Sequence, residues 1–227
     1  MNRVMRMMVF VLVLAISFPV LAKSSRSMSF AVSKAGKVTG RMDVGVSYRD
    51  SGIFAVSSFI HGVAAVKEMK KGKQAIRTYA ELDSNGSIGK YKRWEAKGRG
   101  DRYWFAFVYD GKLKVRHETG PGDKGTTKEL GVAAQAVPLD FEQPHLAWLL
   151  IDNRRDAVEC VGLNPTVMGK ATVKNAGDED VDVFGGGKER LTRWVVSGDC
   201  GEFTVFVDTN GAPKVMVSGS ARFDRMK

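Results

Sequence analysis

The chain has 227 residues, and its 35 lysines and arginines outnumber its 25 aspartates and glutamates to give a formal net charge of +10. This length suits one domain with a sizeable core. In an exported protein, a basic balance favours anionic partners of the cell envelope over nucleic acid, although solubility alone accounts for it equally well.

The first 22 residues are predicted to form a secretory signal peptide. Arg3 and Arg6 supply a basic start, Met7 to Phe18 is a short apolar run, and Val20-Leu21-Ala22 offers the small residues of a cleavage site. The apolar run falls short of the ~20 residues that span a bilayer, so an uncleaved anchor is the lesser alternative. No cysteine lies directly after the cleavage site, which argues against a lipoprotein.

Cleavage near Ala22 predicts a periplasmic protein with a flexible basic leader at 23–29 and a single domain over 30–227. Strand-like alternation runs from Phe30 to Tyr48. Further strands are predicted in two pairs: Gly52–Ile60 and Val63–Met69 about His61-Gly62, then Gln74–Leu82 and Ser87–Ala96 about Asn85-Gly86.

Asp101 to Glu118 contains the strongest hairpin signal, because Asp110-Gly111 separates two extended runs rich in aromatic and branched residues. In a two-residue hairpin Tyr109 faces Lys112, and directly opposed residues share a face. One face then carries Trp104, Ala106, Val108, Leu113, Val115 and His117. The other interleaves rings with basic side chains. We expect it to line the hollow side of the curved sheet as the ligand-binding surface: Tyr103, Phe105, Phe107, Tyr109, Lys112, Lys114 and Arg116.

This ring-bearing face is expected to need a cover. Burying four aromatic side chains is worth on the order of 15 kcal/mol as an upper bound, whereas a cation over an exposed ring returns only about 0.5–1 kcal/mol. The cover can come from the protein itself, with the basic side chains snorkelling to water, from a partner, or from an apolar ligand with an anionic end. The preceding hairpin again places basic side chains opposite aromatic or acidic ones, in the expected pairs Glu81–Lys90, Tyr79–Lys92 and Arg77–Trp94.

The apolar period changes after Pro138, and Pro138–Arg155 is predicted to form the single helix. Asp140 can cap it, Pro144 is tolerated in a first turn, and Trp148 widens an apolar stripe of leucines. That stripe must be buried against a sheet, and the face of Phe105 and Phe107 is one candidate. The later strands are expected at Val167–Lys174, Val181–Phe184, Glu189–Val196, Phe203–Val207 and Lys214–Val217.

Cys160 and Cys200 are predicted to form one structural disulfide, as two cysteines in an exported chain commonly do. Neither belongs to a CxxC pair, and neither has a nearby histidine that would make it a thiolate nucleophile. A closed loop of about 40 residues is worth roughly 4 kcal/mol on the chain-entropy model.

No motif indicates catalysis or metal binding. The histidines are separated singletons without ligand spacing: His61, His117 and His145. Gly185–Lys188 lacks the spacing of a phosphate loop. Four acidic residues match positions of a calcium loop: Asp178, Asp180, Asp182 and Glu189. Val183 stands where that loop needs glycine, so we interpret the segment as a solvated acidic loop and predict neither metal nor cofactor.

About ten short strands and one helix predict a curled antiparallel sheet too long to lie flat. The hairpins, the helix after Leu-Asp-Phe-Glu and the closing RLTRWVVSG…FTVFVDTNGAPKVMVSG hairpin resemble bacterial periplasmic proteins of unknown function over most of Val38 to Gly219. In that family the sheet is an unclosed, half-open barrel around a helix, similar in shape to the lipoprotein carriers of Gram-negative envelopes. The resemblance implies a mainly β half-barrel wrapped around one short α-helix, and no catalytic residues.

The functional hypothesis is a non-catalytic periplasmic protein whose half-barrel binds an amphipathic anionic envelope molecule, such as a lipid or lipoprotein-like ligand, or docks an envelope protein, with peripheral membrane contact. A purely structural envelope protein is one alternative. A small outer-membrane barrel is another, although strands as basic as Lys112–Arg116 argue against it. A third is an enzyme acting on an envelope polymer, for which the spacing shows no catalytic carboxylate pair. Its acids would come from Asp101, Glu118, Asp140 or Glu142.

Overall fold

A computed structural model describes residues 25–61, 75–96, 102–110, 112–120, 124–130, 135–153, 155–163 and 166–226. These residues form a 15-stranded sheet and one short helix, which confirms the predicted mainly β fold. The predicted signal peptide and the predicted strand Val63–Met69 lie outside the described residues.

The sheet is an extended meander in which each strand pairs with its chain neighbours, except that β8 and β9 do not pair and form the two edges, while β1 pairs with β15. All pairings are antiparallel except that of β9 with β10. The strands are β1 Arg26–Lys34, β2 Lys37–Arg49, β3 Gly52–His61, β4 Ala75–Leu82, β5 Ile88–Ala96, β6 Arg102–Tyr109, β7 Lys112–Glu118, β8 Thr126–Glu129, β9 Val137–Leu139, β10 Ala157–Leu163, β11 Thr166–Asp182, β12 Lys188–Gly198, β13 Gly201–Val207, β14 Pro213–Ser218 and β15 Ala221–Arg225.

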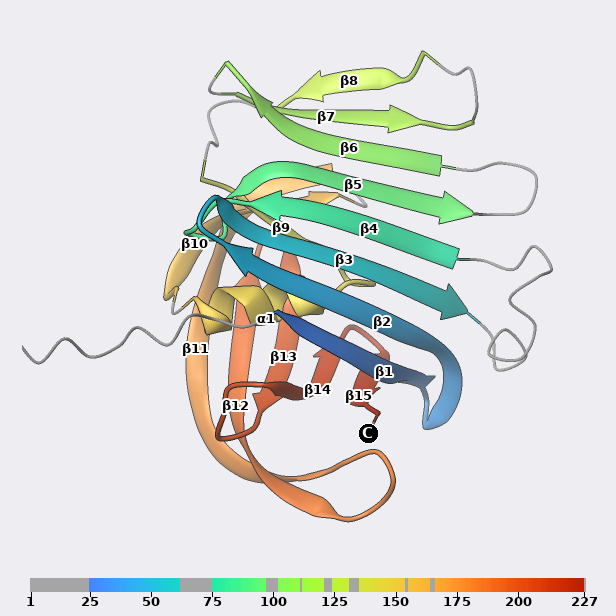
Figure 1. The fold of residues 1–227 in the computed structure, drawn as a ribbon, viewed down its shortest axis with the longest axis vertical. Helices are drawn as coiled ribbons and strands as arrows, with labels where there is room; N and C mark the ends of the chain where they lie inside the picture. Colours follow the sequence, from blue (N-terminus) through green and yellow to red (C-terminus); the bar gives the residue numbers. More distant parts are fainter. Residues whose placement is uncertain are drawn as a thin grey trace, which may run out of the picture.

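The sheet curls around helix α1, His145–Asp152. In Figure 1 the strands β2 to β8 form one wall, the orange and red strands β10 to β15 form the other, and α1 lies between the two. A twisted sheet of this length cannot stay flat, and the apolar helix gives its curled side something to enclose. We call the side of the sheet that faces α1 the inner face and the opposite side the outer face.

Helix α1 is shorter than the predicted Pro138–Arg155. Val137–Leu139 instead pairs with β10 as strand β9, because a run of three buried apolar residues completes the edge of the sheet. The predicted cap Asp140 stabilises the turn before the helix, where its carboxylate accepts the backbone N–H of Glu142 at 2.9 Å. Pro144 takes the N-cap position without a side-chain hydrogen bond.

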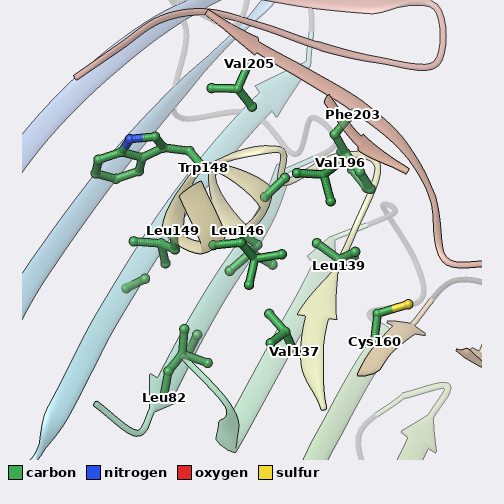
Figure 2. Close-up of a cluster of buried hydrophobic side chains, with 14 of the residues drawn as sticks. Leu82, Val137, Leu139, Leu146, Trp148, Leu149, Cys160, Val196, Phe203 and Val205 are labelled. Carbon is green, nitrogen blue, oxygen red and sulfur yellow. The ribbon is translucent and has the colours of Figure 1, made fainter. Parts of the chain in front are cut away.

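Helix α1 packs at the centre of the half-barrel. Every residue of α1 from His145 to Ile151 is buried, and Trp148 and Leu149 pack in one continuous core with both walls of the sheet. Figure 2 shows Leu146, Trp148 and Leu149 among side chains of β9, β12 and β13. The Trp148 indole N–H donates to the carbonyl of Gly211 at 3.0 Å, so its polar atom is satisfied.

Three strand predictions need correction. The predicted flexible leader enters β1 at Arg26, because its small residues continue the alternation of the central strand. The two predicted strands Val167–Lys174 and Val181–Phe184 form the single long strand β11, which carries a bulge between Asn175 and Gly177. Strand β10 was not predicted.

Cys160 and Cys200 lie at disulfide distance, with their Cα atoms 6.3 Å apart, within the range that a disulfide requires. The pair joins β10 to the turn between β12 and β13 and confirms the predicted pairing.

The predicted acidic loop is a two-stranded ribbon formed by the ends of β11 and β12. Asp178 and Asp180 pair with Thr192 and Arg190 across the ribbon, while Glu189 pairs with Val181 on the other face. The four acidic residues therefore do not converge as calcium ligands would. The ribbon folds back on the outer face of β13 and β14, where it closes a second small core: Val181, Leu191, Phe206 and Val215.

Within the described ranges, no helix is long and apolar enough to cross a membrane.

Candidate functional site on the outer face of the sheet

The register of the β6–β7 hairpin is the predicted one. Tyr109 pairs with Lys112, and the pairing runs back to Trp104 opposite His117. Asp110 has φ of 53°, the left-handed conformation that the turn requires. The preceding pairs Glu81–Lys90, Tyr79–Lys92 and Arg77–Trp94 also form, although a longer turn over Asp83–Ser87 and a bulge replace the predicted two-residue turn.

The two faces of this hairpin lie opposite to the predicted arrangement. Ala106, Leu113 and Val115 belong to the core around α1, so the uncharged side is the inner face. Tyr103, Phe105, Phe107 and Tyr109, with Lys112, Lys114 and Arg116, point outward, away from the helix. The expectation that the rings line the hollow side is therefore wrong, and the face of Phe105 and Phe107 is not the one that covers α1. Burying the interleaved cations would cost far more than leaving the rings partly exposed.

Aromatic rings and charged side chains are interleaved on this outer face. Row by row, Arg77 aligns with Trp94 and Tyr103, Tyr79 with Lys92 and Phe105, and Glu81 with Lys90 and Phe107. Arg77 lies over Trp94 at 5.1 Å, Lys92 over Phe105 at 5.7 Å and Lys114 over Tyr109 at 4.8 Å. We call this surface of β4 to β7 the ring–cation face.

The rings of the ring–cation face are only half-buried. Tyr103, Phe105 and Phe107 are covered sideways by neighbouring stems, and Tyr109 at the hairpin tip is 64% exposed. The aliphatic stems of basic side chains on the same face thus cover part of each ring. The side of the rings that faces away from the sheet stays exposed.

The charge balance of this surface is positive. Among the described outward residues of β4 to β8, six basic side chains stand against three acidic ones: Arg77, Lys90, Lys92, Lys112, Lys114 and Arg116 against Glu81, Glu118 and Glu129. Glu129 pairs with Lys112 at 2.7 Å, which lowers the pKa of its carboxyl group, and Arg116 pairs with Glu118 at 2.8 Å. Within the described part of the chain, Lys90 and Lys92 have no carboxylate partner.

A shallow groove of about 620 Å³ continues the ring–cation face over β1 to β4. Its floor is low because small residues such as Ser27, Gly45 and Ser47 occupy the outward positions of β1 and β2. Val56, which is 46% exposed, and Tyr79 border it. A groove with a mixed polar and apolar lining thus adjoins the cations of β5.

Sequence reasoning missed a buried polar network on the inner face of β5. Arg93 is 1% exposed and donates to the carboxylates of both Asp140 and Glu142. Tyr91 donates to Asp140 at 3.2 Å, and Arg93 stacks over Trp104 at 5.3 Å. These contacts raise the pKa of Arg93 against the opposing effect of burial, so the guanidinium stays charged. One signal was available: β5 carries charged residues on both faces, and an inward charge needs a partner.

Four acidic residues are the candidate catalytic acids of the enzyme alternative. Asp101 lies outside the described residues, and Glu118 pairs with Arg116 at 2.8 Å. Asp140 and Glu142 do converge, but on Arg93, which they hold in place. The arrangement joins β5 to the segment that leads into α1.

The described histidines remain separate. His145 is fully buried at the start of α1, where burial lowers its pKa to about 4, and His117 stacks on Trp104 with ring centroids 4.8 Å apart. His61 ends β3. No group of three or more His, Cys, Asp or Glu side chains able to hold a metal occurs in the described part of the chain.

Comparisons with protein-family models, curated proteins and solved structures find no match to this chain.

Proposed function

We propose that this is a non-catalytic protein of the bacterial periplasm that docks on an anionic, amphipathic envelope surface through its ring–cation face. The observation that carries the proposal is the alternation of half-buried rings with cations on the side of the sheet that turns away from α1. Aromatic rings favour the boundary between water and lipid, and lysines beside them attract anionic headgroups.

Helix α1 occupies the centre of the half-barrel, which supports docking on the outer face over carriage of a ligand at that centre. Trp148 and the leucines of α1 occupy the space that a carrier would keep for its ligand. The ring–cation face, in contrast, keeps an exposed Tyr109 and the two lysines of β5 without carboxylate partners in the described chain. The outer face therefore offers an amphipathic anionic ligand both an aromatic surface for its apolar part and lysines for its charge.

Two features support export. The N-terminal 22 residues have the pattern of a signal peptide, and the Cys160–Cys200 pair suits an oxidising compartment. N-terminal sequencing of the mature protein from a periplasmic extract should begin near Lys23. Recovery of the intact N-terminus from the cytoplasm would contradict this part of the proposal.

Vesicle co-sedimentation tests the docking function. The protein should bind phosphatidylglycerol vesicles and not phosphatidylcholine vesicles, and added salt should weaken the binding. The double variant Lys90→Glu/Lys92→Glu should reduce binding at least about tenfold, because each lysine near an anionic surface is worth about 1 kcal/mol.

The matched control is Lys34→Glu/Lys37→Glu, which makes the same change of charge at the exposed turn between β1 and β2. It should bind almost as the unaltered protein does. Equal losses in the two double variants would mean that net charge alone drives binding, and the ring–cation face would lose its assigned role.

A further inference from the structure

A second groove lies on the inner face of the sheet, beyond the last turn of α1. It encloses about 1320 Å³, more than a typical small-molecule pocket of about 300–1,000 Å³, and it is open along its length. Strands β11 to β13, the turn between β13 and β14, and the segment after the helix form its walls. We call it the Trp194 groove.

An aromatic ring forms the floor of the groove. Trp194 of β12 is partly exposed there and stands between Asn175 of β11 and Val205 of β13. One side of its ring packs on the core, so the ring is held in place. A fixed flat ring at the base of an open groove offers a stacking platform.

The polar rim offers hydrogen-bond donors and acceptors together. Asn175 uses its side-chain oxygen to accept the N–H of Gly177 at 2.8 Å, which leaves its amide N–H groups for a ligand. Thr209 and Asn210 add exposed hydroxyl and amide groups from the β13–β14 turn. A ligand bearing hydroxyl groups, each both donor and acceptor, matches this rim.

The walls are fixed before any ligand arrives. Asp208 accepts the backbone N–H groups of Asn210 at 2.9 Å and Ala212 at 3.0 Å, which sets the turn. Trp148 ties that turn to α1 through the carbonyl of Gly211. Preorganised walls reduce the ordering cost of binding.

Charge excludes anionic ligands from this groove. Its described lining carries three carboxylates and one guanidinium: Asp152, Asp156, Asp208 and Arg155. Arg155 is engaged with the carbonyl of Asn85 at 2.8 Å. Asp152 lies 4.0 Å from Arg26 and accepts a hydrogen bond from Tyr48. The groove is therefore mildly acidic, in contrast with the basic ring–cation face.

We propose that the Trp194 groove binds a short, neutral oligosaccharide, with the apolar face of a sugar ring stacked on Trp194 and its hydroxyl groups bonded to the rim. The inference is independent of the proposed docking function, because it involves other residues on the opposite face of the sheet.

Calorimetric titration of the full chain with chitotriose and with maltotriose tests this site. At least one of these neutral probes should bind at millimolar concentration or below. Trp194→Ala should weaken binding at least tenfold and Trp194→Phe much less, because phenylalanine keeps a ring. Asn175→Ala, at an exposed position, should weaken binding several-fold while the fold is kept.

Trp94→Ala is the matched control, since it removes an equal ring from the outer face. It should leave sugar binding unchanged. Absence of binding by both probes, equal losses in Trp94→Ala and Trp194→Ala, or binding of spermine in place of sugar would overturn the proposal.

Discussion

Arg93 is the residue on which the polar interior depends most. Its buried guanidinium pairs with the buried carboxylate of Asp140 and with the partly exposed carboxylate of Glu142. Paired buried charges add little net stability, but an unpaired one is costly. The network therefore fixes how the segment before α1 sits on β5, more than it adds to stability.

We expect Arg93→Met to lower the free energy of unfolding by about 3–5 kcal/mol, because it leaves the buried carboxylate of Asp140 without its cation. Urea unfolding followed by circular dichroism measures this. Arg77→Met on the exposed side of neighbouring β4 is the control and should cost about 1 kcal/mol or less. Similar effects of the two variants would show that the network is not buried as described.

His145 gives the protein an acid-sensitive stability. Its pKa is about 4 in the folded chain against 6.5 in an unperturbed state, so the unfolded chain binds a proton first as the pH falls. Stability should therefore decrease from about pH 6.5 towards pH 4, by about 2 kcal/mol at pH 5 relative to pH 7. The contribution is absent above pH 6.5, where the imidazole is neutral in both states.

Urea unfolding at pH 7 and pH 5 checks this expectation. His145→Leu should remove most of the difference between the two pH values, and His117→Leu should keep it. An unaltered difference in His145→Leu would place its origin in other groups.

Among the elements, the β6–β7 hairpin was predictable in full register. A two-residue Asp-Gly turn fixes which side chains oppose one another, and each face then follows from the alternation. Which face meets the core was assigned wrongly, although Ala106, Leu113 and Val115 form the face without interleaved cations. The four rings on the other face favour burying that face. In the structure, the cost of burying its interleaved cations is larger and turns it to the outside.

Helix α1 was placed correctly around Trp148 but extended too far. Pro138 and Asp140 are compatible with the start of a helix and equally with an edge strand followed by a turn. The pairing of this segment with β10, which is distant in sequence, favours the strand. The network of Arg93 with Asp140 was out of reach for the same reason, since the two residues are 47 positions apart. Local sequence patterns predict turns and the two faces of a strand, but they do not predict contacts between the two walls of the sheet.

The disulfide is the clearest test at the level of elements. It closes a loop with a sequence separation of 40 between β10 and the β12–β13 turn. Cys160→Ser/Cys200→Ser should lower the free energy of unfolding by about 4 kcal/mol on the chain-entropy model. Thiol titration of the native, unreduced protein should find no free thiol. Two reactive thiols would contradict the cross-link.

At the scale of the whole molecule, a long sheet that curls around one helix has two chemically different binding surfaces. The outer face of β4 to β7 is basic and aromatic, whereas the groove beside the end of α1 is acidic and polar. Because α1 occupies the centre of the half-barrel, we assign binding to these two open surfaces and not to the space at that centre. A protein with this polarity can lie on an anionic surface with one side and present the other to the surrounding space.

Hydroxyl-radical footprinting with mass spectrometry, in the presence and absence of phosphatidylglycerol vesicles, tests the docking orientation most directly. Vesicles should protect Tyr103, Phe105 and Tyr109 from oxidation. They should leave Phe184, 41% exposed at the tip of the β11–β12 ribbon, as reactive as before. Protection of Phe184 with unchanged reactivity at Tyr109 would contradict the account.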